Sequence, residues 1–175
     1  MVRLGVGVVL LVAMTFFTKP SGDRPLRTVP HVDLRRYTGT WYEIARYPNR
    51  FERKCDRDTT ATYTLRDDGK IKVLNACRTK EGTLKKIEGT AKIADRASNA
   101  KLRVTFFWPF YGNYWIIDLD TEYQWVVVGE PSRKYLWILS RTPAMSDAAL
   151  EQIFRRLTSA GYDPSKLMRI PQSTP

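Results

Sequence analysis

The residues that could do chemistry in this chain are few. The sequence holds one histidine, His31, and two cysteines, Cys55 and Cys77. Nucleophilic catalysis by serine or cysteine needs a base positioned beside the nucleophile, and His31 precedes the first predicted strand. A zinc site needs several nitrogen or sulfur ligands, which this set supplies poorly. The sequence therefore predicts neither catalytic residues nor a metal site.

The carboxylates point to structure more than to catalysis. Asp67 and Asp68 stand directly before Gly69, a pattern typical of a hairpin turn and not of a catalytic carboxylate pair. Glu43, inside a predicted strand, is the one remaining candidate for a general acid or base.

The first 31 residues differ in composition from the rest. Arg3 precedes an apolar stretch, Leu4–Phe17, with the length of a signal-peptide core and too short for a comfortable membrane span. We expect a signal peptide or N-terminal anchor over residues 1–22, a linker over 23–31 and one domain over 32–175. Either form of the leader exports the chain, to the periplasm or the outer membrane.

Export decides how the two cysteines are interpreted. In an oxidising compartment Cys55 and Cys77 form one disulfide, which joins the start of the second predicted strand to the end of the third. Closing a loop of this size stabilises a fold by up to about 3 kcal/mol in the chain-entropy description. Two unpaired thiols are the alternative.

The chain is basic, with 29 Lys and Arg residues against 18 Asp and Glu residues. A solvated basic surface is one interpretation, and attraction to lipid headgroups, lipopolysaccharide or nucleic acid is the other. The sequence carries no signature of a nucleic-acid-binding fold, so nucleic acid is not an expected partner.

Short β-type runs separated by turn residues follow from Val32 onward. They are Thr40–Arg46, Thr59–Leu65, Lys70–Ala76, Lys85–Ile93, Lys101–Phe107, Tyr114–Asp118, Tyr123–Val128 and Tyr135–Ser140. No helical period interrupts them, so we expect an all-β, eight-stranded antiparallel up-and-down barrel, whose closure removes exposed edges. One amphipathic helix follows, from its N-cap Ser146 to Gly161, and packs outside the barrel.

Three segments together resemble the lipocalin family. Gly39-Thr40-Trp41 opens the first run, Leu119–Tyr123 forms the turn before the seventh, and Arg141 follows the eighth. The phrases TGTWYEIARYPNRFE and GEPSRKYLWILSRTP are similar to the branch with bacterial outer-membrane lipocalins, plant temperature-induced lipocalin and apolipoprotein D. The resemblance extends from about Leu34 to Pro171. It departs from the family at Leu119 and Thr121, where Thr and Tyr are usual, and in lacking the lipid-anchoring cysteine of the bacterial relatives.

The resemblance implies that Gly39, Trp41 and Arg141 determine the fold, with Trp41 plugging the closed end under the Arg141 side chain. Alternation of side chains along each strand then assigns the inward residues, Ala45 among them, and leaves Ile44 facing the helix. The expected ligand-binding residues are Glu43, Tyr63, Asn75, Val104, Phe106, Tyr114, Trp125, Tyr135 and Trp137. Such mostly apolar walls are typical of a small-molecule pocket, and a filled core is the alternative.

Two loops complete the expected site at the open rim. Arg46, Arg50 and Arg53 form a basic collar for an anionic headgroup, unless they are simply solvated. The aromatic-rich loop Phe107–Gly112 either closes on the ligand or contacts a membrane surface.

The favoured function is therefore a lipid-binding lipocalin that stores or transports fatty acids, lysophospholipids or similar amphiphiles in the bacterial cell envelope, without a cofactor. A basic surface-interaction protein without a bound lipid is the alternative. A lipocalin-fold isomerase that uses Glu43 is the less favoured third hypothesis.

Overall fold

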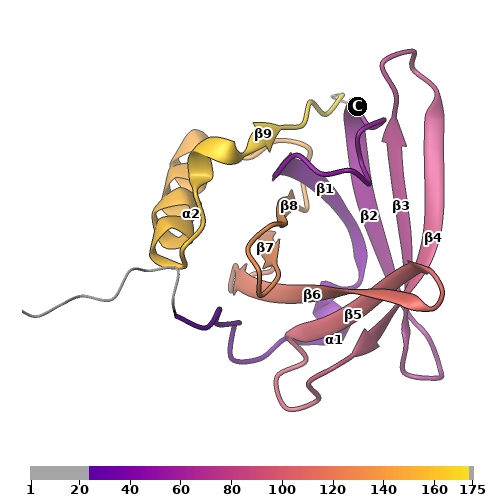
Figure 1. Ribbon diagram of the computed structural model, residues 1–175, viewed down its shortest axis with the longest axis vertical. Coiled ribbons are helices and arrows are strands. Elements are labelled where there is room, and N and C mark those ends of the chain that lie inside the picture. The colour runs from indigo at the N-terminus through magenta and orange to yellow at the C-terminus, as the bar shows by residue number, and fades with distance from the viewer. Residues whose placement is uncertain (1–23, 174–175) are drawn as a thin grey trace, which may run out of the picture.

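The computed structural model describes residues 24–173, and eight antiparallel strands in it close into a barrel (Figure 1). The strands are β1 (Gly39–Arg46), β2 (Arg57–Leu65), β3 (Ile71–Arg78), β4 (Leu84–Ile93), β5 (Lys101–Phe107), β6 (Phe110–Leu119), β7 (Trp125–Gly129) and β8 (Leu136–Ser140). Each strand pairs with its neighbours in sequence, and β1 pairs with both β2 and β8. The predicted up-and-down barrel is confirmed.

Local sequence explains why these segments are strands. In β2 the buried Ala61 and Tyr63 alternate with the less buried Thr60 and Thr62, the period-two pattern of a strand with one face in a core. The turn between β2 and β3 uses Gly69 at φ +73°, a conformation that costs glycine little.

Three short elements were not predicted from the sequence. Helix α1 (Leu34–Tyr37) begins after Asp33, whose carboxylate accepts hydrogen bonds from two backbone N–H groups of the helix. A 3₁₀ helix, η2 (Pro164–Lys166), precedes the two-residue strand β9 (Met168–Arg169). The pairing of β1 with β2 ends at Tyr42, and strand β9 pairs with the same edge of β1 further along, at Ala45 and Arg46. Elements this short carry no periodicity that a sequence could reveal.

Helix α2 (Asp147–Ser159) packs outside the barrel, as Figure 1 shows. The Ser146 hydroxyl accepts a hydrogen bond from the Ala149 N–H, which makes it the N-cap that the sequence predicted. The buried face of the helix consists of Leu150, Ile153 and Leu157, which join a cluster with barrel residues such as Val127 and Ile138.

The segment before α1 is packed against the barrel, although residues 23–31 were expected to form a linker. Leu26 and Val32 are buried, and the Val29 N–H donates to the Ile116 carbonyl at 3.0 Å. The predicted leader, residues 1–22, lies outside the described residues. Within residues 24–173 no helix is both long and apolar enough to cross a bilayer.

Because successive strands reverse direction, their connections lie at two ends of the barrel. The β1–β2, β3–β4, β5–β6 and β7–β8 connections share one end, which we call the open end. Helix α1 and Trp41 mark the closed end. A disulfide between Cys55 and Cys77, with Cα atoms 5.5 Å apart, ties the β1–β2 loop (residues 47–56) to β3 at the open end. This predicted bond is confirmed.

Candidate functional site

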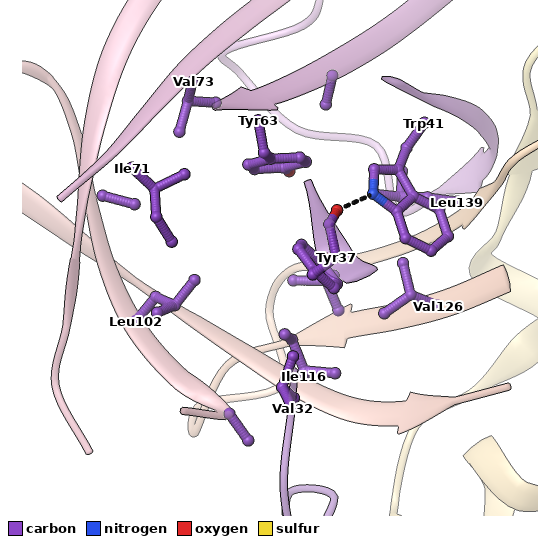
Figure 2. Packing of buried hydrophobic residues seen from close by; sticks show 14 residues of the cluster. Val32, Tyr37, Trp41, Tyr63, Ile71, Val73, Leu102, Ile116, Val126 and Leu139 are labelled. Atoms are coloured by element: carbon purple, nitrogen blue, oxygen red, sulfur yellow. Dashed lines mark hydrogen bonds between the residues drawn. The ribbon is translucent and has the colours of Figure 1, made fainter. Parts of the chain in front are cut away.

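The closed end is sealed by Trp41, which is fully buried (Figure 2). Its indole N–H donates to the Tyr37 carbonyl at 2.9 Å. The Arg141 guanidinium carbon lies 3.8 Å from the centroid of the Trp41 ring. Gly39 has φ +96°, and a Cβ there would lie 3.2 Å from a guanidinium nitrogen of Arg141, so both backbone and space require glycine. The structure thus brings together the three motif residues.

Three tyrosines form a floor above this plug. The Tyr114 hydroxyl lies 2.6 Å from the Tyr37 hydroxyl and 2.9 Å from the Tyr63 hydroxyl. Burial raises the pKa of all three phenols, so they remain protonated at neutral pH. Tyr63 and Tyr114 were expected to contact a ligand. In the structure their hydroxyls are hydrogen-bonded to each other, and the Tyr114 hydroxyl is also hydrogen-bonded to that of Tyr37, which lies on the unpredicted helix α1.

Beyond this floor the inner wall opens toward solvent. Val104, Phe106 and Trp137 pack against the interior cluster and are only partly buried. Ile87 pairs with the inward-facing Asn75 and is 38% exposed, although it lies on the inner face. The indole of Trp137 stacks on the Tyr135 ring, with centroids 5.9 Å apart and planes 8° apart. The inner wall is therefore buried at one end and partly accessible at the other.

A buried charged cluster crosses the open half of the barrel. The Arg46 guanidinium donates to the Glu43 carboxylate at 2.5 Å and to the Cys55 carbonyl at 3.0 Å. The Trp137 indole N–H donates to the Glu52 carboxylate at 3.0 Å, and Arg46 lies 3.9 Å from that carboxylate. The cluster therefore joins the inner wall to the β1–β2 loop.

Arg46 in this cluster corrects the prediction that it belongs to a rim collar, since its side chain is only 3% exposed. A register shift between Glu43 and Ala45 in the β1–β8 pairing is the cause. Such a bulge reverses the alternation beyond it, so Arg46 turns inward. Ala45, expected to point inward, joins Ile44 in the cluster beneath α2.

The electrostatics of the cluster are dominated by its burial. Burial and the neighbouring Glu52 carboxyl raise the pKa of Glu43 well above its ordinary value, and Arg46 offsets only part of this rise. Two carboxyls beside one guanidinium therefore hold a proton at a pH where a solvated glutamate has lost it. The Glu43 carboxyl is engaged by Arg46 and Glu52 within the protein, as expected of a carboxyl that stabilises the structure.

Trp125 is the second correction, because it does not point into the barrel. It packs with the cluster beneath α2, and the Arg156 guanidinium carbon lies 5.1 Å from the centroid of its ring. The interior is contacted by Val126 and Val128 instead. Alternation counted from Tyr123 fails because Tyr123 has φ +59° and lies in the turn before β7.

The rim keeps two of the three predicted arginines. Arg50 and Arg53 are exposed. Arg53 lines a cleft of about 540 Å³ between the β1–β2 loop and the β3–β4 hairpin, together with residues that include Lys54, Lys80 and Lys85. The lysines of the hairpin were not singled out from the sequence, since their proximity to Arg53 depends on how the two connections meet in space.

Four buried side-chain oxygens lack a hydrogen-bond partner within residues 24–173, those of Thr59, Asn75, Thr79 and Thr105. Oδ1 of Asn75 is buried and accepts no hydrogen bond there. Metal ligands are likewise not assembled in this described part of the chain, where no group of three His, Cys, Asp or Glu residues comes together. His31 is exposed and precedes α1.

The fold and this site define a class of protein: a small closed barrel, plugged at one end, with a partly accessible apolar wall at the other. A profile of the lipocalin-like domain matches residues 32–172. The chain belongs to the lipocalin family, as its motifs predicted.

Relatives in the branch that the sequence resembled support this assignment. The chain is 46% identical over 164 residues to the outer membrane lipoprotein Blc of Citrobacter freundii, covering 93% of this chain and 90% of that protein. It is 43% identical over 158 residues to temperature-induced lipocalin-1 of Arabidopsis thaliana, with 86% and 84% covered. Apolipoprotein D of Macaca fascicularis is 36% identical over 142 residues, with 77% and 74% covered.

The fold is also that of more distant solved structures. Insecticyanin from the tobacco hornworm Manduca sexta matches with a TM-score of 0.71 at 22% identity, covering 89% of this chain and 88% of that one. This likeness concerns the barrel alone.

Proposed function

We propose that this lipocalin carries lipids in the bacterial cell envelope: an exported transport protein that holds one fatty acid, lysophospholipid or similar slender amphiphile. The observation that carries the proposal is the partly exposed apolar inner wall of the open half, where Ile87 faces inward and is 38% exposed. The outer membrane lipoprotein Blc from Citrobacter freundii, at 46% identity, supports an envelope location in the periplasm or at the outer membrane.

The acyl chain would lie against Val104, Phe106 and Trp137. Burial of apolar surface favours this by roughly 0.8 kcal/mol for each methylene removed from water. The tyrosine floor limits how deep the chain can reach, since its hydroxyls already bond to one another. The wall and floor together favour a ligand with a narrow tail.

The polar head would remain near the open end. Arg50 and Arg53 are available for charge-assisted bonds to a phosphate or carboxylate, whereas Arg46 is engaged by Glu43. The unpartnered Oδ1 of Asn75 offers an acceptor to a ligand hydroxyl on the inner wall.

We propose a binding role and no catalysis. Glu43, the acid or base that an isomerase would need, is held by Arg46 and beside Glu52. Catalysis would require this carboxyl to exchange its protein partners for a substrate. No cofactor and no nucleic acid enter the proposal.

Mass spectrometry of lipid extracted from the protein purified from its native envelope tests the proposal directly, and we expect a single-chain amphiphile near one per barrel. A matched pair of variants then locates the lipid. Ile87→Trp fills the accessible inner wall, whereas Lys86→Trp puts the same ring on the outer face of β4. We expect Ile87→Trp alone to weaken the binding of lysophospholipid or fatty acid, as measured by titration. Equal binding by both variants, or binding to neither lipid below about millimolar, leaves the basic surface-interaction protein as the better account.

A further inference from the structure

The open end carries exposed apolar side chains on three successive connections. Phe51 in the β1–β2 loop is 65% exposed, and Leu84 beside the β3–β4 hairpin is 49% exposed. The β5–β6 connection is a tight hairpin, in which Phe107 pairs with Phe110. Its Phe107, Trp108 and Phe110 side chains are 69%, 81% and 77% exposed. The expected aromatic loop is thus a projecting tip.

Cations accompany the first two of these connections. The β1–β2 loop and the β3–β4 hairpin with the start of β4 contribute Arg50, Arg53, Lys54, Lys80, Lys85 and Lys86. The acids of these two connections are fewer, namely Glu52, Asp56 and Glu81, and Glu52 is turned to Arg46 and Trp137.

The closed end is different. Its connections, residues 66–70, 94–100 and 120–124, hold three cations, Arg66, Lys70 and Arg96, against five acids. Among these acids, the carboxylates of Asp68, Asp95 and Asp120 accept hydrogen bonds within their own turns. Of the large, strongly exposed apolar side chains in residues 24–173, Leu65 alone borders a closed-end connection, and it is 40% exposed. Exposed aromatic surface and excess positive charge are therefore concentrated at one end of the barrel.

We propose that the open end docks on the surface of an anionic phospholipid bilayer, with the Phe107–Phe110 hairpin inserted at the boundary between headgroups and acyl chains. Aromatic rings favour that boundary, and lysine and arginine side chains contact the lipid phosphates around them. The cleft on the same end faces the headgroup layer, and its lining has four cations, Arg53, Lys54, Lys80 and Lys85, against the two acids Asp56 and Glu81.

Charge complementarity selects a membrane over a second copy of this chain. Two open ends brought together would oppose two sets of cations, which costs free energy. In the docked orientation the accessible inner wall faces the bilayer, so a lipid would enter the barrel directly from the membrane through the open end. Only that last step rests on the proposed function, since docking itself needs no carried lipid.

The test uses the full chain with vesicles of phosphatidylcholine, alone or mixed with phosphatidylglycerol. We expect sedimentation with the mixed vesicles, weakened by added salt, which screens the cations. Trp108→Ser combined with Phe110→Ser should weaken binding by at least about tenfold, because the variant has neither aromatic ring to bury in the bilayer. Leu65→Ser, the same kind of change at the closed end, should leave binding intact.

Bilayers with brominated acyl chains report the orientation. Residues 1–23 contain no tryptophan, so quenching arises from the barrel, and Trp108 is the most exposed of its indoles that could enter the bilayer. We expect quenching in the unmodified protein and its loss in Trp108→Phe, which still binds. Binding without quenching, or equal losses in the hairpin and Leu65→Ser variants, overturns the proposal. So does self-association that buries Trp108 without vesicles.

The same assay separates this proposal from the carrier function. Ile87→Trp should dock normally while failing to bind a single-chain lipid. Normal lipid binding by a protein that does not dock would overturn the docking proposal and leave the carrier intact.

Discussion

The Arg141 guanidinium covers the Trp41 ring at 3.8 Å and donates to four backbone carbonyls, those of Arg36, Tyr37, Thr38 and Thr40, at 2.6 to 3.2 Å. One side chain at the end of β8 therefore holds α1 and the start of β1 in place. The closure of the barrel depends on this contact as well as on the strand ladder.

Replacing Arg141 tests that dependence. Arg141→Ala removes a stacked cation and the hydrogen bonds that it donates to exposed and partly buried carbonyls, so we expect a loss of about 2–4 kcal/mol in the free energy of unfolding. Arg141→Lys should recover only part, because an ammonium cannot reach several carbonyls in one plane. Denaturant unfolding measures both. An unchanged midpoint in Arg141→Ala would show that the contact contributes nothing to closure.

Gly39 and Gly69 form a matched pair of positive-φ glycines. A Cβ at Gly39 would approach the Arg141 guanidinium at 3.2 Å, whereas a Cβ at Gly69 would meet nothing within 4 Å. Alanine disfavours the positive φ of both positions, so each variant should lose about 1–2 kcal/mol in the free energy of unfolding. We expect Gly39→Ala to cost more than Gly69→Ala in thermal unfolding, and the difference measures displacement of Arg141. Equal costs would mean that the guanidinium moves aside freely.

The raised pKa of Glu43 predicts the sign of a pH effect. The folded protein keeps this proton above the unfolded pKa of about 4.3, so the stability contributed by protonated Glu43 is complete below that pH. It is lost as the pH rises through the folded pKa. Glu43→Gln imitates the protonated form, so its melting temperature relative to that of the unmodified protein should rise as the pH increases above about 4.3. Parallel curves for the two proteins would contradict this assignment.

Two tryptophans separate the interior from the exterior of the barrel. Trp137 contacts the interior cluster and Glu52, whereas Trp125 lies beneath α2. If a lipid enters the barrel, its fluorescence signal should survive in Trp125→Phe and largely disappear in Trp137→Phe. A signal that depends on Trp125 would place the ligand near the helix instead.

Much of the fold could be predicted from the sequence because its signals are local. Alternating residues such as Ala61 and Tyr63, and turn glycines such as Gly69, act within a few positions. The disulfide followed from two cysteines and an expectation of export. The motif residues Gly39, Trp41 and Arg141 also anchored the inner face of most strands.

Only the tertiary structure decided where Arg46 and Trp125 point. A bulge after Glu43 and a positive φ at Tyr123 each reset the alternation of a strand, and a reset of one residue exchanges inside for outside. The charged cluster, the tyrosine floor and the cationic cleft were hidden for a related reason. Each joins side chains from separate connections or strands, and such contacts are fixed by the closure of the whole barrel, which no short stretch of sequence encodes.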